Sequence, residues 1–345
     1  MSGVGSDRFG TAGPRIVGVD IARGIAILGM FVAHTLPNPG DTELIADGRS
    51  SILFATLAGV SLGIVSGQDQ PTVRGSRARV YRAVLIRALG IFLLGVVLAS
   101  MASEIAIILD YYAIMFVLVL PALFLPRFVL VGLLALFAWG APALAAAVEG
   151  SRVEQSTSLA DIAREYFLTG YYPALVWLPF LLAGLIAARS GLTRPSTQWA
   201  LVAVGCVSAF AGYGSARVSP SITAEAHSGT PAEIFGSGGV ALAVLGVLLL
   251  LTSSTNAAVR RAATLVFSPV AAAGSMALSV YTVQILVLAI AVRVRDGSGA
   301  IDYPGWPLLW TLIVCTLLFA WLWRRFLGQG PLERALSAAT GSRPG

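Results

Sequence analysis

Ionisable side chains inside long apolar runs are the residues of this sequence most able to do chemistry. Asp20 and Arg23 interrupt the apolar run 16–36 and lie three residues apart. A charge at the centre of a membrane helix costs roughly 2.5 to 3.5 kcal/mol on insertion scales, and this spacing lets the two charges neutralise each other on one helix face. Two interpretations stay open: the pair locks this helix to its neighbours, or Arg23 lines a polar cavity and binds a cofactor, oriented by Asp20.

The two histidines of the chain are candidate general bases. His34 lies three turns beyond Arg23 at the end of the same predicted helix, and His227 lies in the polar stretch 225–230. An imidazole exchanges a proton near neutral pH, which suits a base acting on an acceptor hydroxyl or amine. The alternatives are an interfacial His34 that is hydrogen-bonded to a loop and a solvated His227.

Asp110 is a third candidate catalytic residue, because it lies in the apolar run 105–125, directly before Tyr111 and Tyr112. A carboxyl group in the outer half of a bilayer must face protein or water rather than lipid. The two tyrosines could instead belong to the aromatic belt of a membrane interface.

Arg82 and Arg87 lie near the start of the run 80–101, after a cluster of three further arginines at 74–79. Guanidinium groups at this position could bind a polyanion from the cytoplasm, such as the phosphates of coenzyme A. The alternative is that they set the topology and contact anionic lipid. Cys206 and Cys315 lie in separate apolar runs, so we expect no metal site.

The composition predicts a membrane protein, because 57% of the residues are hydrophobic and only 12% are charged, with a mean hydropathy of +0.82. The apolar runs are continuous rather than alternating, which favours an all-α helix bundle over a barrel. The net charge of +6 comes from scattered basic clusters without interleaved aromatics, so no nucleic-acid partner is expected.

Ten runs are long enough to be predicted as membrane spans. Arginines are more frequent in the alternate connections that include both ends of the chain, which indicates cytoplasmic termini. We therefore expect a flexible cytoplasmic N-terminus (1–14), one transmembrane domain (15–327) and a cytoplasmic tail (328–345). Helical spacing of apolar residues from 159 to 167 also predicts a short surface helix. The predicted spans are 16–36, 51–66, 80–101, 105–125, 128–148, 173–188, 199–217, 236–252, 269–292 and 306–326.

The first of these runs carries a recognisable pattern. Arg15, Asp20, Arg23 and Gly24 stand at the spacing R-x-x-x-x-D-x-x-R-G-x-A, which resembles the heparan-α-glucosaminide N-acetyltransferase family and its bacterial multi-pass relatives. Weaker similarities at 47–54, 58–61, 109–112, 169–173 and 274–282 extend the resemblance over most of the chain.

The resemblance implies a multi-pass acetyltransferase that takes an acetyl group from cytoplasmic acetyl-CoA and delivers it to a glycan or glycolipid across the membrane. It also implies a lipid environment and, together with the arginine-only basic composition, a bacterial plasma membrane. In the eukaryotic enzyme the functional histidine belongs to the outer loop after the first helix, whereas the loop 35–47 has none here, and His34 is the nearest.

The leading hypothesis is therefore a membrane acyltransferase with His34 as general base and His227 or Asp110 in support. The alternatives are a transporter or lipid carrier, in which Asp20, Arg23 and Asp110 line a route, and a scaffold subunit without a cavity. A homodimer is one oligomeric state that the sequence allows.

Overall fold

The computed structural model describes residues 15–36, 44–149, 158–299 and 305–341, and these form helices and loops without a strand. The predicted all-α fold is confirmed. The predicted flexible segment 1–14 lies outside the described residues, and so does most of the loop 35–47, from residue 37 to 43. The helices are α1 (Val17–Thr35), α2 (Arg49–Val65), α3 (Arg77–Ala99), α4 (Leu109–Val119), α5 (Arg127–Glu149), α6 (Leu159–Arg164), α7 (Ala174–Arg189), α8 (Pro195–Val218), α9 (Pro231–Thr252), α10 (Ala257–Val266), α11 (Ser268–Ser275), α12 (Ala277–Ser298), α13 (Gly305–Leu327) and α14 (Pro331–Ala339).

Seven helices of the described chain are long and apolar enough to cross a membrane: α1, α3, α5, α8, α9, α12 and α13. The segment from α6 to α7 is a bent pair with an angle of 41° that makes an eighth candidate. The two shorter apolar helices are α2 and α4 with the turn after it. Each of these elements overlaps one of the ten predicted spans, although the number ten itself stays a prediction.

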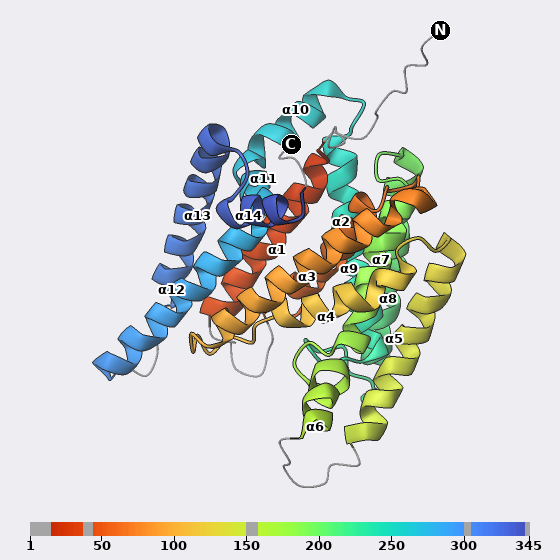
Figure 1. Cartoon of the computed structure of the whole chain (residues 1–345), viewed down its shortest axis with the longest axis horizontal. Coiled ribbons are helices and arrows are strands. Elements are labelled where there is room, and N and C mark those ends of the chain that lie inside the picture. The colour runs from red at the N-terminus through yellow and green to blue at the C-terminus, as the bar shows by residue number, and fades with distance from the viewer. Residues whose placement is uncertain (1–14, 37–43, 150–157, 300–304, 342–345) are drawn as a thin grey trace.

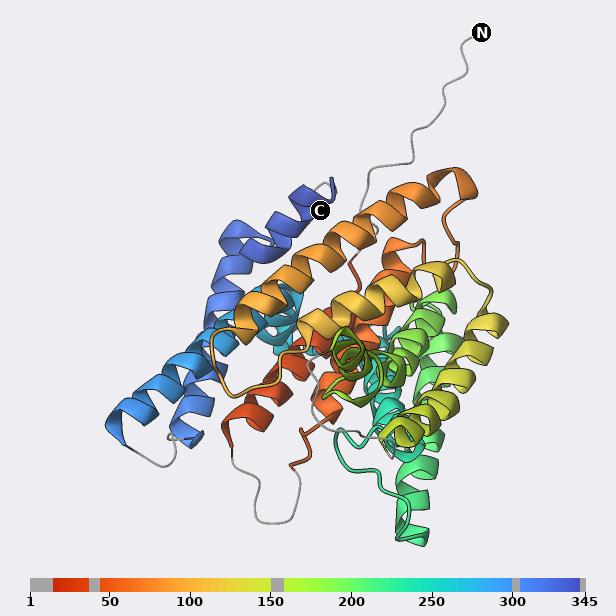
Figure 2. The ribbon, with the colours of Figure 1, turned by 60° about the horizontal axis from the view of Figure 1, so that its bottom comes forward.

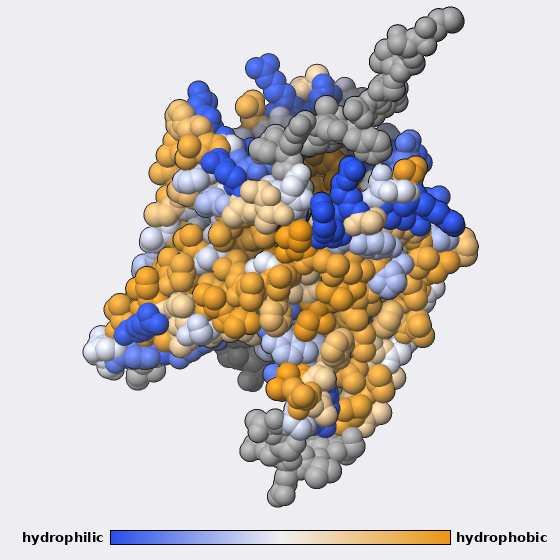
Figure 3. Space-filling model, viewed as in Figure 1, coloured by the Kyte–Doolittle hydropathy of each residue, from blue (hydrophilic) through white to orange (hydrophobic). Residues whose placement is uncertain are grey.

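The surface is divided as a membrane protein requires (Figure 3). Hydrophobic residues form a broad band across the middle, and hydrophilic side chains gather along the upper edge of this view. Figure 1 places the start of α1, α10 and α14 toward that upper end and α6 at the opposite end. Which end faces the cytoplasm stays a prediction.

Close backbone contacts bring α1 against α11. Gly24 faces the carbonyl of Val270, and Gly274 faces the carbonyl of Asp20, so closely that a Cβ atom on either glycine would overlap that oxygen. Without a side chain between them, the two backbones touch, as is common for helices that pack in lipid. This contact fixes the segment of α1 that carries Asp20 and Arg23.

The predicted span 269–292 is divided in the structure into α11 and α12, with the break at Met276 (φ −126°, ψ 42°). Glu333 of α14 accepts hydrogen bonds from the backbone N–H groups of Leu278 (2.7 Å) and Ser279 (3.1 Å). These N–H groups have no partner inside the helix at its first turn. The break is thus capped by a residue that is remote in sequence.

The C-terminal segment, expected as a tail, is helical over α14 and packs against α3 and α12. Figure 2 shows α14 beside α3, and α3 and α4 side by side. The expected surface helix is also present, as α6 followed by a π-helical turn over Glu165–Thr169. Ser158 and Asp161 form a capping box at its start.

Candidate functional site

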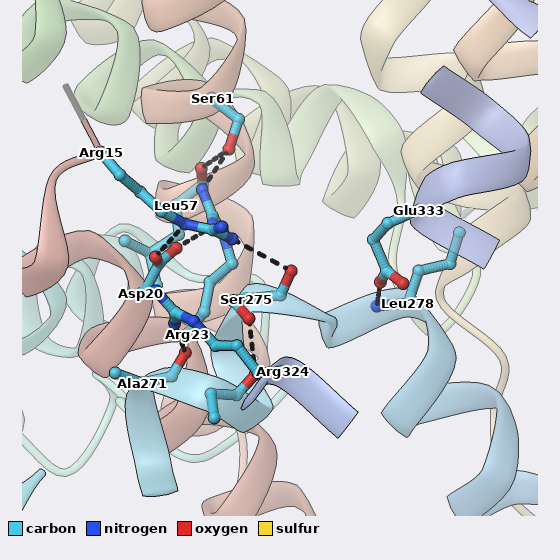
Figure 4. Close-up of polar contacts among 11 residues, drawn as sticks. Arg15, Asp20, Arg23, Leu57, Ser61, Ala271, Ser275, Leu278, Arg324 and Glu333 are labelled. Atoms are coloured by element: carbon cyan, nitrogen blue, oxygen red, sulfur yellow. Dashed lines mark hydrogen bonds and ion pairs between the residues drawn. The ribbon is translucent and has the colours of Figure 1, made fainter. Parts of the chain in front are cut away.

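Asp20 lies at the centre of a cluster of charged residues in the first turns of α1. Its carboxylate accepts a bond from Arg15 Nε at 2.7 Å and one from Arg23 Nη1 at 3.1 Å. Arg23 also donates to Ser61 Oγ of α2 at 2.9 Å. Figure 4 shows the Asp20 carboxylate joined by dashed lines to both guanidinium groups, with Glu333 apart from them beside Leu278. Asp20 is 4% exposed, so the burial of this carboxylate is compensated by two cations.

These arginines border a cavity of about 450 Å³, here called the arginine cavity, to which α1, α2, α3, α4, α11, α12 and α14 contribute. Arg15, Arg23 and Arg87 supply its positive charge, and Glu333 is the acidic residue of its lining. The Glu333 carboxylate is already engaged at the start of α12, where it also accepts from Ser279 Oγ at 2.5 Å. The arrangement therefore leaves guanidinium charge available for an anionic ligand.

The wall of the arginine cavity beyond these charges is apolar, and it includes Phe54, Leu62, Ile91 and Leu109. A ligand that fits it has an anionic part and a less polar arm. This combination of a few convergent polar groups with an apolar wall is typical of small-molecule sites.

A second cavity, of about 260 Å³, lies at the other end of α1 and contains both histidines, so we call it the histidine cavity. Asp47, Tyr171 and Tyr172 are also in its lining. His34 lies 11 positions beyond Arg23 on α1, a distance of roughly 16 Å along a helix axis. The two cavities thus occupy opposite ends of one helix.

His34 is oriented by α12. Its Nδ1 atom lies 2.9 Å from Nε2 of Gln284, a side chain that is 1% exposed. The hydrogen bond joins the end of α1 to α12 through Nδ1 of the ring.

His227 is held in an unusual backbone conformation. Its φ is +60°, a left-handed value that is uncommon outside glycine. Buried Glu233 supports it by accepting from the backbone N–H of His227 and of Gly229, each at 2.7 Å. The imidazole lies parallel to Trp177 and next to Tyr171, with ring centroids at 5.9 and 4.3 Å. Burial lowers the pKa of His227 to about 4, so the ring is neutral at pH 7.

A thin partition separates the cavities. Tyr281 of α12 is part of the lining of both. Tyr112 lines the arginine cavity and donates from its hydroxyl to the carbonyl of Ser51, at 3.2 Å, while Ser51 lines the histidine cavity. The ring of Phe54 stacks on Tyr112 at 5.9 Å. Side chains rather than a whole helix therefore divide the two spaces.

The structure brings His34 and His227 together in the histidine cavity. It brings Arg23 and Arg87 together in the arginine cavity, where Asp20 is bonded to Arg23 but is not part of the lining. Asp110 lines neither; it is buried and accepts from the Tyr166 hydroxyl at 2.8 Å.

Arg82 is exposed and also lines neither cavity. It lies on α3, five residues before Arg87, which lines the arginine cavity.

Some residues of the two sites were not singled out from the sequence. Arg15 appeared only in the family pattern, Ser61 only in a weak similarity, and Glu333 not at all. No sequence pattern identifies Glu333 as a site residue, because its contacts depend on the packing of α14 against α12. Among the described residues, no group of three His, Cys, Asp or Glu side chains could hold a metal ion.

Comparison with known proteins gives two family matches. Residues 187–342 are similar to a family described as "Protein of unknown function (DUF418)". Residues 15–215, more than half of the chain, match the family model "Heparan-alpha-glucosaminide N-acetyltransferase, catalytic". No curated protein matched the chain. No solved structure matched it. The second family match includes Arg15, Asp20, Arg23, His34 and the partition residue Tyr112, and it shows that the chain belongs to the heparan-alpha-glucosaminide N-acetyltransferase family of multi-pass membrane proteins.

Proposed function

We propose that the protein transfers an acetyl group, or a similar acyl group, from cytoplasmic acyl-CoA to a glycan or glycolipid on the other side of the membrane. The observation that carries this proposal is that the arginine cavity and the histidine cavity meet at Tyr281. A donor in the first can present its thioester to an acceptor in the second across one side chain. The family match supports acetyl transfer as the reaction class.

The arginine cavity suits acetyl-CoA. Arg15, Arg23 and Arg87 can contact phosphate oxygens, for which guanidinium is well shaped. The apolar wall beyond them can accept the less polar arm that ends in the thioester. In this arrangement Asp20 keeps Arg15 and Arg23 in position and does not itself contact the donor.

The histidine cavity suits the acceptor. The acceptor hydroxyl or amine attacks the thioester carbonyl carbon, the new C–O or C–N bond forms, and the C–S bond breaks. His34 takes the proton of the nucleophile through Nε2, and that proton then goes to the departing thiolate, which leaves as the free thiol of coenzyme A. Neutral His227, next to Tyr171, borders the space where the acceptor binds. Asp110 has no part in this scheme because it lines neither cavity.

Charge distribution supports a cytoplasmic arginine cavity. The ends of the chain's helices near it carry Arg15, Arg324 and Arg325, and basic residues are enriched on the cytoplasmic side of membrane proteins. The same argument supports cytoplasmic termini, and the family resemblance with the arginine-only composition supports our proposal of a bacterial plasma membrane. The histidine cavity then opens on the extracytoplasmic side.

The test uses the full chain purified in detergent, with radiolabelled acetyl-CoA and cell-envelope glycans. We expect label in the glycan fraction, and a loss of about 10² to 10⁴-fold in rate for His34→Ala. Binding of coenzyme A to the same preparation is measured separately. Failure to bind coenzyme A would contradict the proposed function. Unchanged transfer by His34→Ala would contradict the assignment of His34 as the base.

The break between α11 and α12 favours a second candidate, a carrier, because broken helices often form the binding sites of transporters. A carrier would move its substrate into liposomes without forming an acyl product. Chemical identification of the labelled product in the transfer assay therefore separates the two functions.

A further inference from the structure

The side chain of Gln284 faces Nδ1 of His34. The orientation of its amide decides which of the two ring nitrogens carries the proton and which can accept one. The structure places the amide nitrogen 2.9 Å from Nδ1. An amide nitrogen only donates, so in this orientation Nδ1 is an acceptor, and a neutral ring then carries its proton on Nε2. A ring with a proton on Nε2 cannot act as a base through that atom.

The reverse orientation of the amide gives the tautomer that a base needs. The oxygen and nitrogen of an amide occupy nearly the same volume, so turning the group by half a rotation keeps its packing. The oxygen would then accept the proton of Nδ1, and Nε2 would carry the lone pair. The present orientation leaves Gln284 Oε1 buried without a hydrogen-bond partner among the described residues, which is costly. The reverse orientation supplies this oxygen with a donor and turns the amide nitrogen away from Nδ1, so the amide makes one bond to the ring in either orientation, and the tautomer of His34 distinguishes the two.

We infer that Gln284 is a positioning residue: its amide oxygen accepts the Nδ1 proton of His34 and thereby keeps Nε2 as the basic nitrogen. This inference rests on the proposed function and deepens it. When His34 takes the proton of the acceptor, both ring nitrogens become donors, and Gln284 Oε1 already accepts from one of them. The amide thus serves the neutral base and the cation that it becomes.

The chain has only two histidines, which permits a direct measurement of the tautomer. The full chain is prepared with ¹⁵N-labelled histidine. The ¹⁵N NMR chemical shifts of each imidazole ring show which ring nitrogen carries the proton. A His227→Asn sample assigns the remaining signals to His34. We expect His34 to be protonated on Nδ1 at neutral pH. A proton on Nε2 instead would overturn the inference.

Two substitutions of Gln284 extend the test. Gln284→Met keeps the size but cannot accept the proton, so we expect the His34 tautomer to shift and kcat to fall by about tenfold to a hundredfold, with KM for acetyl-CoA unchanged. Gln284→Glu retains an acceptor, so it should keep the Nδ1 proton and lose much less activity. Equal losses in both variants would contradict the inference.

The readouts also separate this inference from the proposed function. The tautomer is measured on the protein without substrate and does not require transfer. If the protein binds no coenzyme A, the proposed function is contradicted, even where the nitrogen shifts give the expected tautomer. If the protein transfers acetyl groups while Nε2 of His34 carries the proton, the proposed function is supported and the role inferred for Gln284 is contradicted.

Discussion

The hydroxyl of Tyr112 donates a hydrogen bond of 3.2 Å to the carbonyl of Ser51, and these two residues line different cavities. Together with Tyr281, which lines both cavities, they form the partition that a transfer reaction must reach across. In the proposed reaction, the same partition separates the water of the histidine cavity from a donor in the arginine cavity.

Replacing Tyr281 with leucine should therefore allow water to hydrolyse the donor thioester. A shorter side chain connects the cavities, and water can then attack the thioester without an acceptor. We expect Tyr281→Leu to release coenzyme A from acetyl-CoA in the absence of glycan, measured with a thiol reagent. Tyr281→Phe keeps the ring and serves as the control, with release at the level of the unaltered protein. Equal release by both variants would show that the ring is not the barrier.

The sequence predicted the helices well because the physics that sets them is local. Each apolar run of sufficient length must satisfy its backbone hydrogen bonds internally, and this requirement predicts a helix wherever the run occurs. The one-span prediction for 269–292 missed the break at Met276 because that break depends on tertiary contacts. Gly274 touches the backbone of Asp20, and Glu333 caps α12 from 55 residues away.

The candidate site was predictable in its residue types but not in its grouping. Charges and histidines in apolar runs stand out, since lipid makes them costly. His34 and His227 were both predicted as candidate bases, but only the fold shows that they share a cavity. Asp110 gave the same signal in the sequence as Asp20, yet it bonds to Tyr166 and lines neither cavity. A buried carboxylate alone does not distinguish a structural hydrogen bond from a site.

Neutralising the arginines of the arginine cavity should weaken donor binding selectively. Arg23→Gln and Arg87→Gln each remove one guanidinium group from the lining, whereas Arg82→Gln removes one from a position on the same helix as Arg87 that lines neither cavity. A hydrogen bond to a charged group contributes about 1.5 to 3 kcal/mol, which corresponds to a loss of roughly tenfold to a hundredfold in affinity. Calorimetry with coenzyme A measures the effect. Equal weakening by Arg82→Gln would indicate general charge attraction instead.

The contact of Glu333 with the start of α12 should hold α14 over the arginine cavity. Its carboxylate accepts from Leu278, Ser279 N and Ser279 Oγ, and an amide accepts such bonds more weakly than a charged group does. We expect Glu333→Gln to increase protease cleavage of the C-terminal segment and to raise KM for acetyl-CoA, with a smaller effect on kcat. Glu225→Gln, on an exposed loop, is the matched control. Unchanged cleavage would show that other contacts hold α14.

Acid should destabilise the packing of His227. Because burial lowers its pKa from 6.5 to about 4 in the folded protein, the unfolded chain binds more protons between these values, and stability falls as the pH decreases from about 6.5 to about 4. We expect the melting temperature in detergent to decrease over this range. His227→Gln should show a smaller decrease, since it has no imidazole to protonate. Parallel pH profiles for the two proteins would contradict this role of burial.

The contact of α11 with α1 should be sensitive to a single methyl group. A Cβ atom at Gly274 would overlap the carbonyl oxygen of Asp20, whereas one at Gly214 of α8 would meet no atom within 4 Å. Overpacking of this kind costs typically about 1 to 3 kcal/mol, while alanine in place of glycine at an open helical position is favourable by about 1 kcal/mol. Gly274→Ala should therefore lower the melting temperature, and Gly214→Ala should keep or raise it. Because the displaced segment carries Asp20, the affinity of Gly274→Ala for coenzyme A should also decrease. A variant that melts normally and binds normally would show that α1 and α11 can separate without disturbing the arginine cavity.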